Sequence, residues 1–159
     1  MPKTDMVRAY TESLLKQILD TDNVGRDPDG DYPVQFNSAL YFVRIDPGSN
    51  DEPVVQIFAV ALAGIEAGPE LFEQLNSINR RLRYARCFWV ENQVLIESEM
   101  AGDELSLAGL GRTCETVGGA ADYFGQQLAE EFGGQTAFAD EKGEDYEPPA
   151  EERLPGFYL

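Results

Sequence analysis

Few residues of this chain are suited to catalysis, because histidine is absent from all 159 positions. Without histidine, Ser-His-Asp and Cys-His catalysis are excluded, and so is any metal site built on imidazole. Carboxylates remain: Glu97 and Glu99 stand two apart on a predicted strand, so they share a face on which a pair could transfer protons. Acids on a strand surface are ordinary, however. We therefore expect no catalytic residues and no enzymatic activity.

The acidic loop RDPDGDYP raises the question of a calcium site. Asp27, Asp29 and Asp31 match the D-x-D-x-D start of an EF-hand loop, which also needs Gly at its sixth position and Glu at its twelfth. Those positions hold Tyr32 and Ser38. An ordinary acidic turn is favoured, and we expect neither a bound metal nor a cofactor.

Charge and cysteine usage limit the class of partner and the compartment. With 12 basic and 29 acidic residues the net charge is −17, which disfavours nucleic acids and anionic membranes as partners. Cys87 and Cys114 lie in apolar patterns outside any CxxC pair, which predicts reduced core thiols. No apolar stretch approaches the ~18 residues that span a bilayer, and MPKTDMVRAY does not resemble a signal peptide. We expect a cytoplasmic protein.

Hydrophobic spacing predicts three helices and five strands. The helices are expected at 5–20, 69–83 and 106–132, and the strands at 32–37, 39–45, 54–62, 84–90 and 93–100. The order αβββαββα lacks a βαβ rhythm and is typical of an α+β fold with an antiparallel sheet of about five strands. We expect residues 1–134 to form this domain and residues 135–159 to form an acidic, proline-containing tail.

Two of the predicted strands are apolar on both faces. VVQIFAVAL (54–62) has Gln56 as its one polar residue, and ALYFVRI (39–45) has only Arg44. The chain's own helices can cover one face of such a sheet. The other face needs a further helix or a partner.

Glycines punctuate the long last helix at an interval of seven. Gly111, Gly118 and Gly125 fall on one flank, and each costs about 1 kcal/mol in helix propensity relative to alanine. We interpret this flank as a surface that lies close to the sheet or to another helix. The alternative is a break into two helices at Gly118-Gly119.

The second helix and the strand after it carry residues of an interface type. Asn76 and Asn79, which are costly in a helix interior, share a flank with Phe72 and Arg83, as in a partly polar interface or an exposed face. Trp89 fits either core packing or an interface anchor. The four arginines of NRRLRYAR (79–86) either complement the helix C-terminus or dock an acidic segment, such as the tail.

The stretch LNSINRRLRYARCFWVENQVLIESEM (75–100) resembles the centre of YbjN-like proteins. The predicted element order is similar to the fold that these proteins share with class I type III secretion chaperones of the CesT type, over roughly residues 5–134. The resemblance implies a small, acidic, often dimeric protein without enzymatic activity. It also implies binding of an extended client peptide along helix and sheet surfaces, with the second helix in the dimer contact.

We therefore predict a chaperone-like homodimer that binds peptide or protein segments, to which an exposed strand edge would offer main-chain hydrogen bonds. The predicted peptide-binding residues are Tyr10, Leu14, Ile18, Phe36, Tyr41, Phe42 and Phe58. The predicted dimer or interface residues are Phe72, Leu75, Asn76, Asn79, Arg83 and Trp89. The alternative is a regulatory or structural adaptor that engages a partner through the tail, with its Phe157-Tyr158-Leu159 end. A further alternative is that the tail covers the spare apolar face of its own domain.

Overall fold

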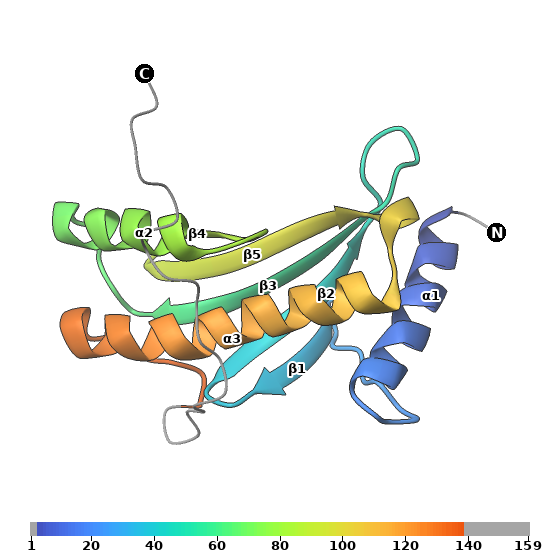
Figure 1. Ribbon diagram of the computed structural model, residues 1–159, viewed down its shortest axis with the longest axis horizontal. Helices are drawn as coiled ribbons and strands as arrows, with labels where there is room; N and C mark the ends of the chain where they lie inside the picture. Colours follow the sequence, from blue (N-terminus) through green and yellow to red (C-terminus); the bar gives the residue numbers. More distant parts are fainter. Residues whose placement is uncertain (1–2, 139–159) are drawn as a thin grey trace.

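The computed structural model describes residues 3–138 (Figure 1). Within that range the elements are α1 (Lys3–Ile18), β1 (Tyr32–Phe36), β2 (Ala39–Asp46), β3 (Val54–Ala63), α2 (Pro69–Arg81), β4 (Arg86–Val90), β5 (Gln93–Ala101), a 3-10 turn η1 (Gly102–Glu104) and α3 (Leu107–Phe132). The predicted order αβββαββα is confirmed. The predictions made for residues 139–159 lie outside the described part of the chain.

The strands form one antiparallel sheet in the order β1-β2-β3-β5-β4, which confirms the predicted fold class. Three of the four pairings join neighbours along the chain, whereas β3 pairs with β5 across the intervening α2 and β4. In this register Phe42 lies opposite Phe58, and Val60 lies opposite Leu95. Because side chains alternate along a strand, the register gathers apolar residues into rows on both faces.

All three helices pack on the same face of the sheet. α3 crosses this face and contacts β1, β2, β3 and β5 (Figure 1). α1 packs beside the first half of α3, where Ile18 approaches Gly111. α2 packs beside the second half, where Ile78 and Leu128 line one cleft. Within residues 3–138, the opposite face of the sheet therefore has no helix over it.

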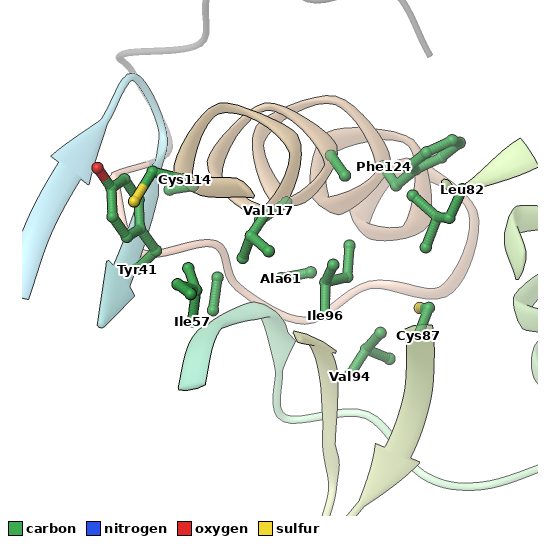
Figure 2. Close-up of a cluster of buried hydrophobic side chains, with 14 of the residues drawn as sticks. Tyr41, Ile57, Ala61, Leu82, Cys87, Val94, Ile96, Cys114, Val117 and Phe124 are labelled. Carbon is green, nitrogen blue, oxygen red and sulfur yellow. The ribbon is translucent and has the colours of Figure 1, made fainter. Parts of the chain in front are cut away.

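The core is the layer of side chains between the sheet and α3 (Figure 2). Ile57 and Ile96 from the strands meet Val117 and Phe124 from the helix, and each is at most 1% exposed. Complete burial of a side chain of this size contributes about 1.5–3 kcal/mol. Every second residue of the strands contributes to one side of this layer, and the apolar residues spaced three and four apart along α3 contribute to the other.

α3 is a single continuous helix, and its glycines allow it to lie close to the sheet. A Cβ atom at Gly125 would overlap the backbone carbonyl of Ala61, and one at Gly118 would lie 2.9 Å from the ring of Phe36. A Cβ at Gly111 would make only an ordinary contact with Ile18, at 3.7 Å. The close-approach interpretation is confirmed for two of the three glycines, and the alternative break into two helices is wrong.

Asp122, in the middle of α3, holds the turn between β1 and β2. Its side chain is 3% exposed, and Oδ1 accepts hydrogen bonds from the Ser38 backbone N–H (3.0 Å) and from the Ser38 hydroxyl. Asn37 Nδ2 donates to Oδ2 at 3.4 Å. Asn37 has φ +51°, a left-handed conformation that asparagine tolerates in a two-residue hairpin turn. The carboxylate thus ties the outer hairpin to the helix layer.

Three predicted elements miss an observed end by two residues. The first helix, predicted at 5–20, spans Lys3–Ile18, and the second, predicted at 69–83, ends at Arg81. β4 begins at Arg86, whereas the sequence predicted a strand from residue 84. Tyr84 has φ +60°, which is incompatible with an extended strand. The Tyr84 carbonyl accepts a hydrogen bond from Ser98 Oγ at 2.6 Å. A side-chain hydroxyl therefore takes the place of the backbone N–H that would bond this carbonyl in a continuing strand. The Tyr84 ring is left 81% exposed.

The chain after α3 returns along the sheet. Gln135 and Ala63 exchange both backbone hydrogen bonds at 2.9 Å. The Phe138 N–H then donates to the Ser38 carbonyl, also at 2.9 Å. The last described residue therefore lies at the β1–β2 turn.

Candidate interaction surface

The sheet face opposite the helices, called the open face below, presents a row of apolar side chains. Along β2 and β3 every second residue is buried under the helices, and the residues between them are only partly buried. The apolar residues of the open face include Leu40 and Phe42 on β2, Phe58 and Val60 on β3, Leu95 on β5, and Phe88 and Val90 on β4. The rings of Phe42 and Phe58 stack with centroids 5.3 Å apart. A contiguous apolar patch of this kind, left uncovered, is typical of an interaction site.

Two arginines border this apolar row, and each is fixed by a carboxylate. The Arg44 guanidinium lies 4.7 Å from the centroid of the Phe58 ring, and its Nε donates to Asp31 at 2.9 Å. Arg86 lies 5.6 Å from the centroid of Phe88 and pairs with Glu97. The hydrogen bonds that these arginines donate to Asp31 and Glu97 raise the pKa of both guanidinium groups. An apolar centre with a charged border is the usual composition of a protein interface.

Both edges of the sheet are protected against the addition of another strand. In each outer hairpin the two residues that flank the two-residue loop are hydrogen-bonded to each other across the strands. From there the edge strand alternates. One residue directs its backbone N–H and C=O towards the neighbouring strand, and the next directs them away from the sheet. On β1 one such residue is Pro33, which has no N–H. On β4 the outward residue Cys87 is bonded at both backbone groups by Asn79, with Oδ1 accepting at 2.7 Å and Nδ2 donating at 2.8 Å. This arrangement disfavours the edge-pairing mode expected from the sequence and directs attention to the open face.

A groove of about 770 Å³ adjoins one end of the open face. Met6 and Tyr10 of α1, which are 56% and 48% exposed, form one wall. Val54 and Ala101, which pair across β3 and β5, contribute to the floor. Val54 belongs to the same alternate set of β3 residues as Phe58, so the groove continues into the open face along β3.

The seven predicted peptide-binding residues fall into separate environments. Phe42 and Phe58 lie together on the open face, and Tyr10 lines the groove. Leu14 and Tyr41 are each 3% exposed in the core, where the Tyr41 hydroxyl is hydrogen-bonded to Cys114 and burial raises its pKa. Ile18 and Phe36 pack against that core from the helix side. The structure thus stacks Phe42 on Phe58 on the open face and places the other five residues elsewhere.

The six predicted interface residues are also divided by the structure. Phe72, Asn76 and Arg83 are exposed, whereas Leu75 is buried beneath α2. Asn79 bonds the edge of β4, as described above.

Trp89 is half-buried and structurally fixed. Its indole Nε1 donates to the Ile65 carbonyl at 3.0 Å, and the Phe72 ring meets it edge-to-face with centroids 6.4 Å apart. The exposed ring of Phe72 therefore rests on a rigid support.

Leu40, Val60, Phe88 and Leu95 were not predicted as site residues. The alternation that marks Phe42 and Phe58 also passes through these positions. That signal shows that both faces of the sheet are apolar, but it does not identify the face that the helices leave open.

The groups considered for chemistry have structural partners. Burial raises the pKa of both Cys87 and Cys114 to about 12, so neither thiol is a nucleophile at neutral pH. Glu97 pairs with Arg86, and Glu99 accepts a hydrogen bond from Gln56 Nε2 at 2.9 Å.

In the acidic loop, Asp27 Oδ1 accepts the backbone N–H groups of Asp29 and Asp31, both at 2.9 Å. These two hydrogen bonds hold the acidic loop in a turn. Within residues 3–138 no three Cys, Asp or Glu side chains are arranged to hold a metal ion. In the same range no helix is both long and apolar enough to cross a bilayer.

Comparison with known proteins identifies structures and a family that are similar to this chain. The solved structure "Crystal Structure of the ExsC-ExsE Complex" contains a chain of similar fold, with a TM-score of 0.59, 15% sequence identity, and coverage of 76% of this chain and 94% of that chain. At this identity the likeness is one of fold. Curated proteins give no significant match. A family model described as "T3SS (YopN, CesT) and YbjN peptide-binding chaperone 1" matches residues 5–140, which confirms the resemblance drawn from residues 75–100. The chain therefore belongs to this family of type III secretion and YbjN chaperones.

Proposed function

We propose that this protein binds extended apolar segments of other proteins on the open face and releases them without chemical change. The observation that carries the proposal is the row of half-buried apolar residues that runs across the open face from Leu40 on β2 to Phe88 on β4. The described chain places no helix over this row. Membership of a peptide-binding chaperone family supports the same function. So does the absence of histidine, which leaves few groups for catalysis.

The geometry favours a client that lies along β3. From Val54 in the groove to Val60 the strand spans about 20 Å at ~3.3 Å per residue, which is the length of a short extended peptide. Side chains of the client would meet the stacked rings of Phe42 and Phe58 in the middle of this path. Aromatic groups in such a position commonly supply most of the binding energy.

The first test is to screen an immobilised array of short random peptides and to measure one bound peptide by fluorescence anisotropy. Replacing Phe58 by serine is expected to weaken that peptide about tenfold, since loss of a central aromatic contact costs roughly 1.4 kcal/mol or more. The matched control is Leu107→Ser, which removes an exposed apolar side chain from α3, on the helix side of the sheet. Equal affinities of the two variants, or preference for folded proteins only, would contradict the proposal.

We further propose that two copies associate through the exposed side of α2. Phe72 is 49% exposed and is flanked by the polar residues Asn76 and Arg83, a composition that suits a symmetric contact. Its support from Trp89 restricts the ring before association and so lowers the entropic cost.

Light scattering tests the oligomeric state. The unchanged protein is expected to have the mass of two copies, and Phe72→Glu the mass of one, because the carboxylate would be buried in the contact. Tyr10→Glu, on the groove wall, is the control that should leave the mass unchanged. A monomeric unchanged protein would overturn this part of the proposal but not the proposed peptide binding.

A further inference from the structure

The open face has a candidate occupant within the same chain. Residues 139–159 leave the described domain at Phe138, whose N–H is bonded to Ser38 in the β1–β2 turn. Leu40, at the near end of the open face, is two residues further along that turn. A segment beginning here is tethered directly beside the apolar row.

The composition of the segment identifies the part that fits the open face. Residues 140–153 contain seven acids and two bases, and the domain before them is itself acidic, so this stretch is repelled from the surface. Residues 154–159, LPGFYL, carry no charged side chain and include Phe157 and Tyr158. Aromatic side chains of this kind match the stacked rings of Phe42 and Phe58.

The length of the tether is also suitable. Residues 139–153 form a connection with a root-mean-square span of about 20 Å if flexible, and up to about 50 Å if fully extended. The open face from β2 to β4 is three strand spacings wide, or roughly 15 Å. At such a match the effective concentration of the tethered segment is on the order of millimolar.

We propose that residues 154–159 bind the open face of their own chain and compete there with client peptides. The competitive consequence rests on the proposed function, whereas the docking itself does not. A tethered competitor lowers the fraction of molecules in which the site is free. The apparent association constant for any client is the intrinsic constant multiplied by that free fraction. Salt strengthens the docking, since it screens the repulsion between the acidic stretch and the acidic domain.

Photo-crosslinking of the full chain tests the docking. A benzoylphenylalanine probe replaces Phe157, and equal amounts of unlabelled and heavy-isotope-labelled protein are unfolded together in urea and refolded before irradiation, so that any dimers contain both species. Crosslinks within one isotopic species to peptides of β2, β3 or β5 are the expected result. A probe at Tyr146, in the acidic stretch, is the matched control and is expected to give few crosslinks to those strands.

Each other outcome overturns the proposal. Crosslinks of mixed isotopic mass would show that a second copy holds the segment. Crosslinks from position 157 to the α1 groove or to the arginines of residues 80–86, or none at all, would place the segment elsewhere.

A second measurement separates failure of this inference from failure of the proposed function. In the full chain, replacing both Phe157 and Tyr158 by serine is expected to tighten an array-selected peptide by about three- to tenfold. Unchanged peptide affinity, together with crosslinks outside the open face, would reject the tail but retain the peptide site. Crosslinks on the open face, together with no binding of any array peptide, would retain the docking of the tail and reject the proposed peptide site.

Discussion

The Asp122→Ala variant is expected to unfold with a free energy about 3 kcal/mol below that of the unchanged chain. The substitution leaves the buried backbone N–H and hydroxyl of Ser38 without their acceptor. A hydrogen bond to a charged group contributes about 1.5–3 kcal/mol, and an unsatisfied buried donor adds its desolvation cost. For a domain of this size the loss corresponds to a melting temperature lower by roughly 6–12 °C.

Urea denaturation at constant protein concentration measures this loss. Glu115→Ala, an exposed site on the same helix, should change stability by less than about 0.5 kcal/mol. Asp122→Asn keeps an acceptor oxygen and should fall between the two. A loss below about 1 kcal/mol for the alanine variant would mean that the turn is held by its own backbone conformation.

The second large effect concerns the glycine flank of α3. Gly125→Ala is expected to destabilise the fold by about 2 kcal/mol, although alanine is the better helix former by about 1 kcal/mol. The added methyl group would overlap the Ala61 carbonyl, which is backbone in the centre of the sheet and has no rotamer to change. Overpacking of this kind typically costs 1–3 kcal/mol.

Gly111→Ala provides the matched control, because its methyl group would make only an ordinary contact with Ile18. Here the helix propensity is not opposed, so the variant is expected to be more stable by up to about 1 kcal/mol. Thermal or urea denaturation should then give changes in the free energy of unfolding of opposite sign for Gly125→Ala and Gly111→Ala. The same sign for both would contradict the close approach at Gly125.

The protected edges and the open face together determine how a client can bind. A strand added at β1 would meet Pro33, and one added at β4 would have to displace Asn79 from Cys87. Contact through the face needs neither change, since Phe42 and Phe58 are already partly exposed. The edge protection also limits uncontrolled aggregation by a protein that carries an apolar surface.

The sequence predicted the elements well because their signals are local. The 3-4 spacing of α3 and the two-residue step of the strands depend on neighbours within a few positions, and the register of each hairpin follows from its short loop. The boundary error at β4 arose where a long-range hydrogen bond from Ser98 holds Tyr84 out of the extended conformation.

The candidate site could be predicted only in part. Tyr41 and Phe42 are adjacent aromatic residues in one strand, and the sequence treats them alike. The structure places Tyr41 in the core and Phe42 on the open face. Asn79 resembled an interface residue because its partner, the backbone of Cys87, cannot be recognised from a pattern of side chains.

The amino-acid sequence by itself determined the helices and strands, an apolar character on both sides of the sheet, and the lack of histidine chemistry. Tertiary structure alone decided which side α3 covers, since the alternation of a two-sided strand is symmetric with respect to its faces. The pairing of β3 with β5 and the seating of Gly118 and Gly125 break that symmetry. They are long-range contacts whose energy depends on shape, which no local pattern encodes.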